Sequence, residues 1–430
     1  MSARSAAVTT SAAEPVRQAG AAGSFEDLLL PGVLVPAFQP IMDLLTGSVV
    51  GYEALARWPG LPAATPDRVF REAHRIGRVA DLDWACRLAA LRTAMDSGMP
   101  ADRTLFVNVE PASVGRPAPE HAACVLTAAQ GRLRIMLELT ERALFTHPAE
   151  LMRTVGAARD RGWGIALDDV GANPASLAML PFVSPDVIKL DLSLIQASPS
   201  STPARIMAAV MAHAERTDAS VLAEGVESEA HLERALSLGA VLGQGWYFGR
   251  PGPIDDLPPA PTQIPFAQGY DAAPTTPFDL VARHRSLRVG RKRLLLAFSR
   301  FIEDQALNVG TPPVVLTAFQ TAARFTPGTR RRYQQIAARC PFVGVLGADL
   351  PATPLPGVRG ADLAAHDPLV GEWTVVVVGD HYAGALIARD LGDDGPDHDR
   401  RFEFVVTHDR RVVLAAGRSL MSRLLPRARP

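Results

Sequence analysis

The 430-residue chain has few of the features that mark secreted, membrane-spanning or disulfide-linked proteins. It contains only three cysteines, Cys86, Cys124 and Cys340, and they lie far apart. This spacing fits neither a disulfide framework nor a zinc site, so we interpret them as small apolar side chains in a reducing compartment. No apolar run reaches the roughly 18 residues of a transmembrane helix, and the first twenty residues lack the apolar stretch of a signal peptide. We therefore expect a cytoplasmic protein with no membrane span.

An excess of charge of either sign is also missing. Lysine and arginine number 44 and aspartate and glutamate 45, which gives a net charge of −1. This balance disfavours a broad basic surface that would bind a nucleic-acid polymer, although it says nothing about a local site. Hydrophobic residues make up 47% of the chain and charged residues 21%, so a sizeable core is possible and global disorder is excluded.

Changes in composition divide the chain into four parts. Residues 1–24 are rich in alanine, serine and threonine and are predicted to form a disordered arm. Residues 253–276 are dense in proline, which sustains neither a helix nor a central strand, and are predicted to be a linker. The remaining blocks, 25–252 and 277–430, are each long enough to form a domain.

The first block alternates short apolar runs with longer helical patterns. The runs occupy residues 49–55, 104–109, 134–139, 164–167, 187–190 and 220–223. Repeated strand-then-helix units of this number and length favour an α/β fold with a parallel (β/α)8 barrel. The second block shows helical patterns at 293–307 and 330–340, then strand-like runs at 342–347, 372–379, 382–391, 401–409 and 411–417. This order indicates a smaller α+β domain with its strands in a meander.

Polar side chains occur at or near the ends of the predicted barrel strands. They are Glu53, Asn108, Glu138, Asp168, Asp169, Lys189, Asp191 and Glu224. A single acid at such a position most often contacts solvent or caps a helix. Six strand ends carrying such groups favour a shared site, because the carboxyl ends of barrel strands converge on one face. Carboxylate and amide oxygens suit Mg²⁺ or Mn²⁺, and two such ions can promote phosphoester displacement. Lys189 could then orient the attacking water.

Ordered motifs in residues 33–252 resemble those of the EAL-domain phosphodiesterases, which hydrolyse cyclic di-GMP to linear pGpG. The motifs are FQPI, GYEALARW, FVNVEP, ELTE, LDD, VIKLD, AEGVE and QGWYFGRP. The resemblance implies a modified TIM barrel, a homodimer formed through the barrel, and a two-metal site that takes Mg²⁺ or Mn²⁺. It implies metal ligands at Glu53, Asn108, Glu138, Asp168, Asp169 and Glu224, and catalytic roles for Lys189, Glu53 and Glu224.

The same resemblance assigns further residues around this site. Gln39, Arg57, Asp191 and Gln244 resemble substrate-binding positions, with Arg57 suited to a phosphate. Glu141 and Glu227 resemble residues that support the site, Glu141 by bracing the loop after Asp169. That loop reads DDVGANPASL where the family typically has DDFGTGYSSL. Pro174 lacks an N–H and restricts Asn173, so the departure bears on turnover and on coupling to dimerisation.

The second block resembles a DICT domain, a sensory module found alongside signalling domains. The segments PGVRGADL, DPLVGEWTVVVVG and RFEFVVTHDRRVV carry this resemblance, which attaches no ligand or partner chemistry. Together the two resemblances imply a metal-dependent cyclic di-GMP phosphodiesterase regulated by its C-terminal domain. Two alternatives stay open: a catalytically silent cyclic di-GMP receptor, favoured by the altered loop, and a sensory or interaction protein that uses the barrel as a scaffold.

Overall fold

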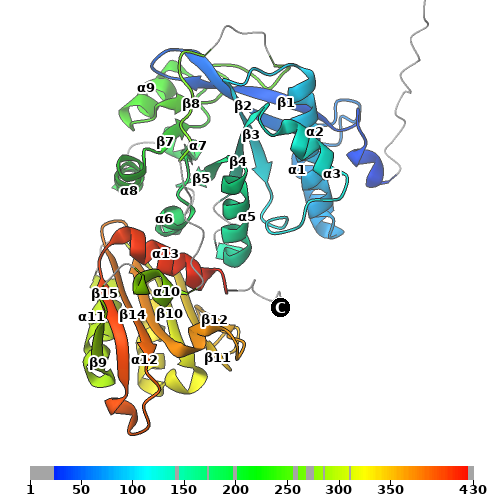
Figure 1. Cartoon of the computed structure of the whole chain (residues 1–430). Helices are drawn as coiled ribbons and strands as arrows, with labels where there is room; N and C mark the ends of the chain where they lie inside the picture. The colour runs from blue at the N-terminus through cyan, green and yellow to red at the C-terminus, as the bar shows by residue number, and fades with distance from the viewer. Residues whose placement is uncertain are drawn as a thin grey trace, which may run out of the picture.

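The computed structural model describes residues 24–140, 145–171, 174–196, 201–254, 260–267, 276–283, 286–308 and 311–424. Most of the predicted N-terminal arm, part of the predicted linker, Glu141 and Asn173 lie outside these ranges. A barrel forms the N-terminal part and a layered sheet forms the C-terminal part, with helix α13 (Arg410–Met421) between them (Figure 1). Within the described ranges, no helix is both long and apolar enough to cross a membrane.

Eight strands close the barrel, as the predicted (β/α)8 architecture requires. They are β1 (Val35–Asp43), β2 (Ser48–Arg57), β3 (Thr104–Val109), β4 (Arg134–Thr140), β5 (Gly164–Val170), β6 (Val187–Leu190), β7 (Ser220–Ala223) and β8 (Leu242–Gly243). Six of them match the predicted runs. Strand β1 is antiparallel to both of its neighbours, β2 and β8, while the other barrel pairs are parallel. This reversed first strand is the modification of the TIM barrel.

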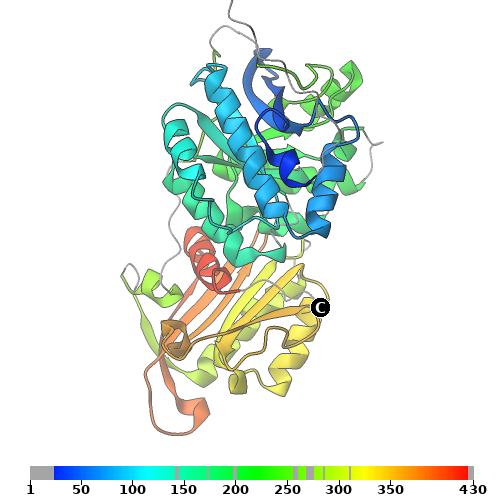
Figure 2. The ribbon, with the colours of Figure 1, turned by 90° about the vertical axis from the view of Figure 1, so that its right-hand side faces the viewer.

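Helices cover the outside of the barrel (Figures 1 and 2). They are α1 (Pro66–Arg75), α2 (Val79–Asp96), α3 (Ala122–Ala129), α5 (Pro148–Asp160), α6 (Leu180–Val183), α7 (Leu192–Gln196), α8 (Ser201–Thr217) and α9 (Glu229–Ser237). The 3₁₀ helix η2 (Pro174–Met179), which comes after β5 in the sequence, runs directly into α6. The segment that follows the two aspartates therefore continues into a short helix on the outside of the barrel.

Side-chain alternation builds two layers inside the barrel. Successive residues of a strand point to opposite faces, so positions i and i+2 share the interior. An apolar cluster contains one residue from each of β3 to β7: Phe106, Met136, Ala166, Val187 and Leu222. Two positions further along each strand lie Asn108, Glu138, Asp168, Lys189 and Glu224. The apolar layer thus forms a floor beneath a polar layer nearer the carboxyl ends of the strands.

Residues 260–267 pack across the amino-terminal end of the barrel. Ile264 is buried in the apolar floor, and its carbonyl accepts a hydrogen bond of 2.6 Å from Arg134. The Phe266 ring lies beneath the same arginine, with the guanidinium carbon 4.3 Å from the ring centre. The backbone N–H of Ala267 donates to Asp186 at 2.5 Å. This part of the proline-rich segment therefore closes the barrel opposite the polar layer.

The second domain is a seven-stranded mixed sheet in the order β12-β11-β10-β13-β14-β15-β9. Its strands are β9 (Arg288–Arg291), β10 (Val314–Thr321), β11 (Phe342–Ala348), β12 (Val358–Asp362), β13 (Glu372–Val378), β14 (Ala383–Asp390) and β15 (Arg401–Thr407). Helices α11 (Lys292–Asn308) and α12 (Pro327–Ala337) pack on one face, and α10 (Pro277–Ala282) and α13 on the other. The α+β class is confirmed.

Two details of the predicted second domain are wrong. Strands β13, β14 and β15 do form a meander, but β10, β11 and β12 pair in parallel. Residues 411–417, predicted as a strand from their valines, lie in helix α13. Asp409 caps this helix by accepting from the N–H groups of Arg411 and Val412. Its buried Val413, Ala416 and Leu420 recur at helical spacing, so burial of one face outweighs the local strand preference.

Helix α13 joins the two domains through direct contacts with α6. The Arg418 guanidinium donates to the carbonyls of Pro181 and Phe182 and to the Ser184 hydroxyl, at 3.2, 3.0 and 2.8 Å. Apolar residues of the barrel and of this sheet face belong to one continuous core cluster. On the other side of the contact, Arg359 donates to the carbonyl of Phe145. The second domain is thus packed against the barrel rather than tethered to it.

Candidate active site

Lys189 lies at the centre of the polar layer and is surrounded by carboxylates from four strands. Its Nζ is 2.7 Å from Glu138, 2.8 Å from Glu224, 3.2 Å from Asp168 and 3.5 Å from Glu53. The lysine side chain is 1% exposed and that of Glu138 is fully buried. Residues separated by up to 171 positions in the sequence therefore form one charged cluster, as their places at the strand ends predict.

A bulge at the end of β5 brings the two adjacent aspartates to the same site. In a regular strand Asp168 and Asp169 would point to opposite faces. Here the pairing with β6 shifts register between Leu167 and Val170, and Asp169 has a left-handed φ of 58°. Carboxylate oxygens of Asp168, Asp169 and Glu224 consequently lie within 4.8 Å of one another. Left-handed backbone is costly for most non-glycine residues and is tolerated best by Asn and Asp.

Amide side chains hold Glu53 in place. Its carboxylate accepts hydrogen bonds of 2.9 Å from Asn108 Nδ2 and 2.7 Å from Gln244 Nε2. The same Gln244 amide lies 3.2 Å from Gln39 Oε1, and Gln39 donates in turn to the Gly249 carbonyl. The reversed strand β1 supplies Gln39 opposite Glu53 in the ladder with β2. Four of the predicted site residues therefore form one hydrogen-bonded row beside Lys189.

Burial and charge shift the proton affinities within this cluster. Burial raises the pKa of Glu138 well above its ordinary value, and the neighbouring Glu53 raises it further. Burial also raises the pKa of Glu224, to about 8. For Glu53, the effect of burial is outweighed by Lys189, Gln244 and Asn108, so its pKa is lowered. The pKa of Lys189 is raised well above normal despite burial, because the surrounding carboxylates stabilise its charge. The lysine therefore stays protonated.

The donor set fits divalent metal ions. Glu53, Glu138, Asp168 and Glu224 surround Lys189, and Asp169 lies beside Asp168 and Glu224, so five carboxylates gather in one cluster with a single lysine at its centre. The Glu138 carboxylate is fully buried: its Oε1 forms the ion pair with Lys189, and its Oε2 has no hydrogen-bond partner among the described residues. Buried carboxylates need a counter-ion, and hard oxygen ligands are those that Mg²⁺ and Mn²⁺ prefer.

Other predicted site residues lie around this cluster without a direct contact to Lys189. Arg57 is half-buried and its guanidinium donates to the Ala56 carbonyl, while its charge interacts with Glu53. Asp191 accepts from the Ser193 N–H at the start of α7. Glu227 is exposed, and its N–H donates to His231. Glu141 lies outside the described residues.

Two further groups of the site were missed at the sequence level. The Gly249 carbonyl, which orients Gln39, belongs to a motif already noted, but a backbone acceptor leaves no signal in the residue type. Thr140 lies opposite Asp168 in the β4–β5 ladder, with a buried hydroxyl that makes no hydrogen bond. Threonine is common at strand ends, so the residue type gives no signal. Only the pairing of Thr140 with Asp168 in the ladder indicates that it belongs to the site.

Two family models match the chain, one over each domain. Residues 24–251 match the model of the EAL domain, which is more than half of the chain. The chain belongs to the EAL domain family. Residues 280–391 match a second family, described as the sensory domain in diguanylate cyclases and two-component system (DICT). Both resemblances noted from the sequence motifs are confirmed.

Several known proteins match about half of the chain. The cyclic di-GMP phosphodiesterase RocR of Pseudomonas aeruginosa is 32% identical over 224 residues, which cover 50% of this chain and 57% of RocR. The oxygen sensor protein DosP of Escherichia coli is 29% identical over 234 residues, 51% of this chain and 28% of DosP. The chain therefore matches only about half, or less, of the length of these relatives.

Two solved structures are each similar to about half of the chain. The manganese and cyclic di-GMP complex of Klebsiella pneumoniae BlrP1 at pH 9.0 is 28% identical, with a TM-score of 0.46, and the match covers 52% of this chain and 57% of BlrP1. A calcium complex of BlrP1 with the same nucleotide matches at 29% identity and a TM-score of 0.45, over 51% of this chain and 56% of BlrP1.

Proposed function

We propose that this EAL protein is a metal-dependent phosphodiesterase that hydrolyses cyclic di-GMP to linear pGpG. The observation that carries the proposal is the convergence of five carboxylates, Asn108 and Lys189 at one end of the barrel. Relatives with this domain include proteins named as cyclic di-GMP phosphodiesterases, which supports this substrate class. A near-neutral chain can bind a compact dianion through metals held by such an acidic cluster.

The metal ligands proposed are Glu53, Asn108, Glu138, Asp168, Asp169 and Glu224. Divalent ions bound there would lower the pKa of water and neutralise charge that develops on the phosphate. Glu53 is already oriented by Asn108 and Gln244, so its carboxylate needs little rearrangement. The bulge at the end of β5 allows both Asp168 and Asp169 to serve as ligands together with Glu224.

Lys189 is proposed to hold the attacking water and Arg57 to contact the phosphate. Hydrolysis adds the water oxygen to phosphorus and breaks the bond to one ribose 3′ oxygen, which leaves a 5′ phosphate on the linear product. A buried ammonium with four carboxylates within 3.5 Å keeps a fixed position, as a water-orienting group requires. Gln39, Gln244 and Asp191 are proposed to line the nucleotide side, and Glu227 to support it.

The test is turnover of cyclic di-GMP by the purified full-length chain with Mg²⁺ or Mn²⁺, read as pGpG by chromatography. Glu53→Gln keeps the size of the side chain but removes its charge, and we expect turnover to fall at least about a hundredfold. The matched control is Glu120→Gln, an exposed acid outside the site, which should leave turnover unchanged. Nucleotide binding without pGpG formation would favour a silent receptor, and the absence of both would refute the assignment.

Regulation by the second domain is proposed through α6. This helix follows η2, which itself follows Asp168 and Asp169 by only a few residues. Arg418 of the second domain binds the carbonyls at the C-terminal end of α6. A change in how α13 packs would therefore act on the segment attached to two proposed metal ligands. The Arg418→Ala variant tests this: we expect altered turnover with an unchanged cyclic di-GMP specificity.

A further inference from the structure

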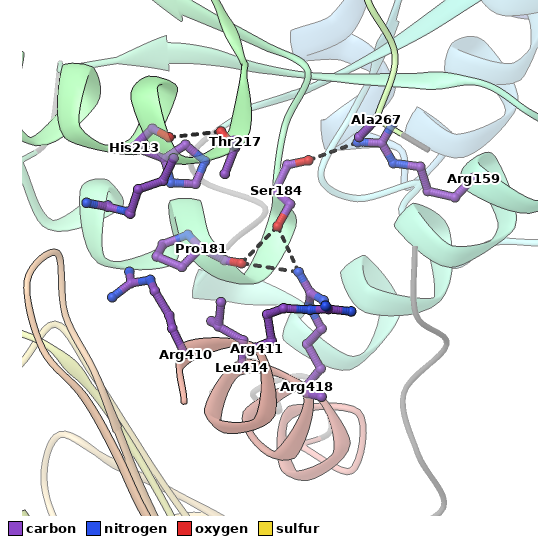
Figure 3. A pocket seen from close by; sticks show the side chains of 12 residues that line it. Arg159, Pro181, Ser184, His213, Thr217, Ala267, Arg410, Arg411, Leu414 and Arg418 are labelled. Atoms are coloured by element: carbon purple, nitrogen blue, oxygen red, sulfur yellow. Dashed lines mark hydrogen bonds between the residues drawn. The ribbon is translucent and has the colours of Figure 1, made fainter. Parts of the chain in front are cut away.

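A cavity of about 360 Å³ lies between the barrel and the second domain, on the side of the barrel away from the candidate active site. Its barrel wall comes from the C-terminal ends of α5 and α8 and from α6, and its other wall is the start of α13 (Figure 3). Ser184 and Thr217 on this wall precede strands β6 and β7, so the cavity borders the amino ends of these strands. It cannot be part of the polar layer around Lys189.

Positive charge is concentrated around this cavity. Five arginines line it, namely Arg159, Arg216, Arg410, Arg411 and Arg418, and none of its described lining residues is an aspartate or glutamate. The charge of Arg159 is paired with Asp186 at 2.6 Å, and Arg418 is hydrogen-bonded to α6. Asp380 lies near Arg216 and Arg410 but does not line the cavity. Arg216 and Arg410 therefore bring positive charge to a cavity whose described lining residues include no acid.

Two buried nitrogen groups on this wall lack hydrogen-bond partners among the described residues. His213 is 3% exposed, and its Nε2 has no partner. Burial lowers the pKa of His213 to about 4, and the charges of Arg216 and Arg410 act in the same direction, so the ring is neutral at pH 7. Nη2 of Arg410 is also buried without a partner. Buried polar atoms without a partner are rare in proteins because burying them without a hydrogen bond is costly.

We infer that this cavity binds a small organic phosphate. Arginine guanidinium groups match the geometry of phosphate oxygens, and Arg216 and Arg410 approach the cavity from different domains. A phosphate would give the buried Arg410 nitrogen an acceptor. The His213 ring lines the same cavity. Pro181, Leu414 and Ala415 provide an apolar wall for the organic part, and the volume lies in the range of small-molecule sites.

Because both domains line the cavity, the packing of α13 against the barrel would depend on the concentration of the phosphate compound. A ligand that binds only the packed arrangement stabilises it in proportion to the logarithm of ligand concentration over Kd. The site would therefore convert the level of a phosphate compound into the strength of the contact between α13 and α6. This inference does not depend on the proposed phosphodiesterase activity.

The experiment is calorimetric titration of the metal-free full-length chain with sodium pyrophosphate and, in a second arm, with guanosine monophosphate. We expect one site, at least about tenfold weaker in Arg410→Gln and in Arg216→Gln, since each removes a charged donor. Arg216 is exposed on α8, so its variant should fold normally. Tighter binding of the nucleotide identifies an organic ligand, and equal or tighter pyrophosphate binding identifies a free phosphate instead, against the inference.

The matched control is Arg300→Gln. Arg300 lines a separate cavity inside the second domain, so its loss should leave the titrations unchanged. Binding that is lost in Arg300→Gln but kept in Arg216→Gln and Arg410→Gln would place the ligand elsewhere and overturn the inference. So would the absence of binding by both probes.

Discussion

The contact between α13 and α6 depends on the absence of a side chain at Gly417. A Cβ at this position would lie 2.7 Å from Cε1 of Phe182 and 3.5 Å from Cγ1 of Val376. The Phe182 ring is fully buried, so it has no open space into which it could move. Gly417→Ala therefore adds one methyl group at a close contact between the two domains.

Two effects of this substitution oppose each other. Alanine is favoured over glycine in a helix interior by about 1 kcal/mol, which would stabilise α13. Overpacking a closed interface costs about 1–3 kcal/mol. Since carbon atoms in contact are normally about 3.5–4.0 Å apart, a 2.7 Å approach to a rigid ring should make the steric cost larger. We expect Gly417→Ala to lower the free energy of unfolding by about 1 kcal/mol.

Urea unfolding of the full-length chain in a double-mutant cycle with Phe182→Leu measures this balance. Leucine removes the ring atom that the new methyl would meet, so Gly417→Ala should become neutral or stabilising in that background. We expect a coupling energy of about 1 kcal/mol or more between the two positions. Gly328→Ala in α12 is the control: its Cβ would contact nothing within 4 Å, so it should not destabilise. A stabilising Gly417→Ala in both backgrounds would refute the steric argument.

Three further predictions concern buried charges. Burial raises the pKa of Glu372 to about 7 from 4.5, so the folded state holds this proton more tightly. The contribution of Glu372 to stability should be fully present below pH 4.5 and be lost, by roughly 3 kcal/mol, as pH rises through 7; Glu372→Gln should remove this part of the pH dependence in urea titrations at several pH values. Asp186 accepts hydrogen bonds from Arg159 and from the N–H groups of Ile165 and Ala267. Asp186→Ala should therefore lower the free energy of unfolding by about 3–5 kcal/mol. A decrease below about 1 kcal/mol in chemical unfolding would contradict this role. Lys189→Met leaves its carboxylate partners unpaired. Thermal unfolding in EDTA should then show a destabilisation of about 3 kcal/mol or more, which added Mg²⁺ reverses in part. Equal stability of the variant and the parent in EDTA would argue against the ion pairs.

Much of the barrel and its site could be predicted because local sequence patterns indicate both. Apolar runs of strand length identify six of the eight barrel strands, and polar residues near their ends identify Glu138, Asp168 and Glu224. The two missed strands lack such a pattern: β1 contains Pro36 and Pro40, and β8 has only two residues. Proline removes a ladder donor, so a strand of this kind is recognised only when its partners are in place.

Other features depend on contacts that no local pattern reports. Helix α13 contains valines that favour a strand, and it becomes helical where one of its faces is buried against the sheet and the barrel. The reach of Lys189 to four carboxylates requires the barrel to close. The bulge that turns Asp169 towards Glu224 requires the pairing of β5 with β6.

The sequence alone determined the near-neutral charge and the spacing of acids at the strand ends. This spacing can be interpreted without the structure, because side-chain alternation and strand polarity follow from the backbone. They suffice to place hard oxygen ligands at one end of a barrel. Only the tertiary structure decided that the proline-rich segment closes the other end, that α13 packs on α6, and that Arg159, His213, Arg216 and Arg410 surround one cavity. These groups come from segments up to 251 residues apart, and they meet because the second domain packs against the barrel.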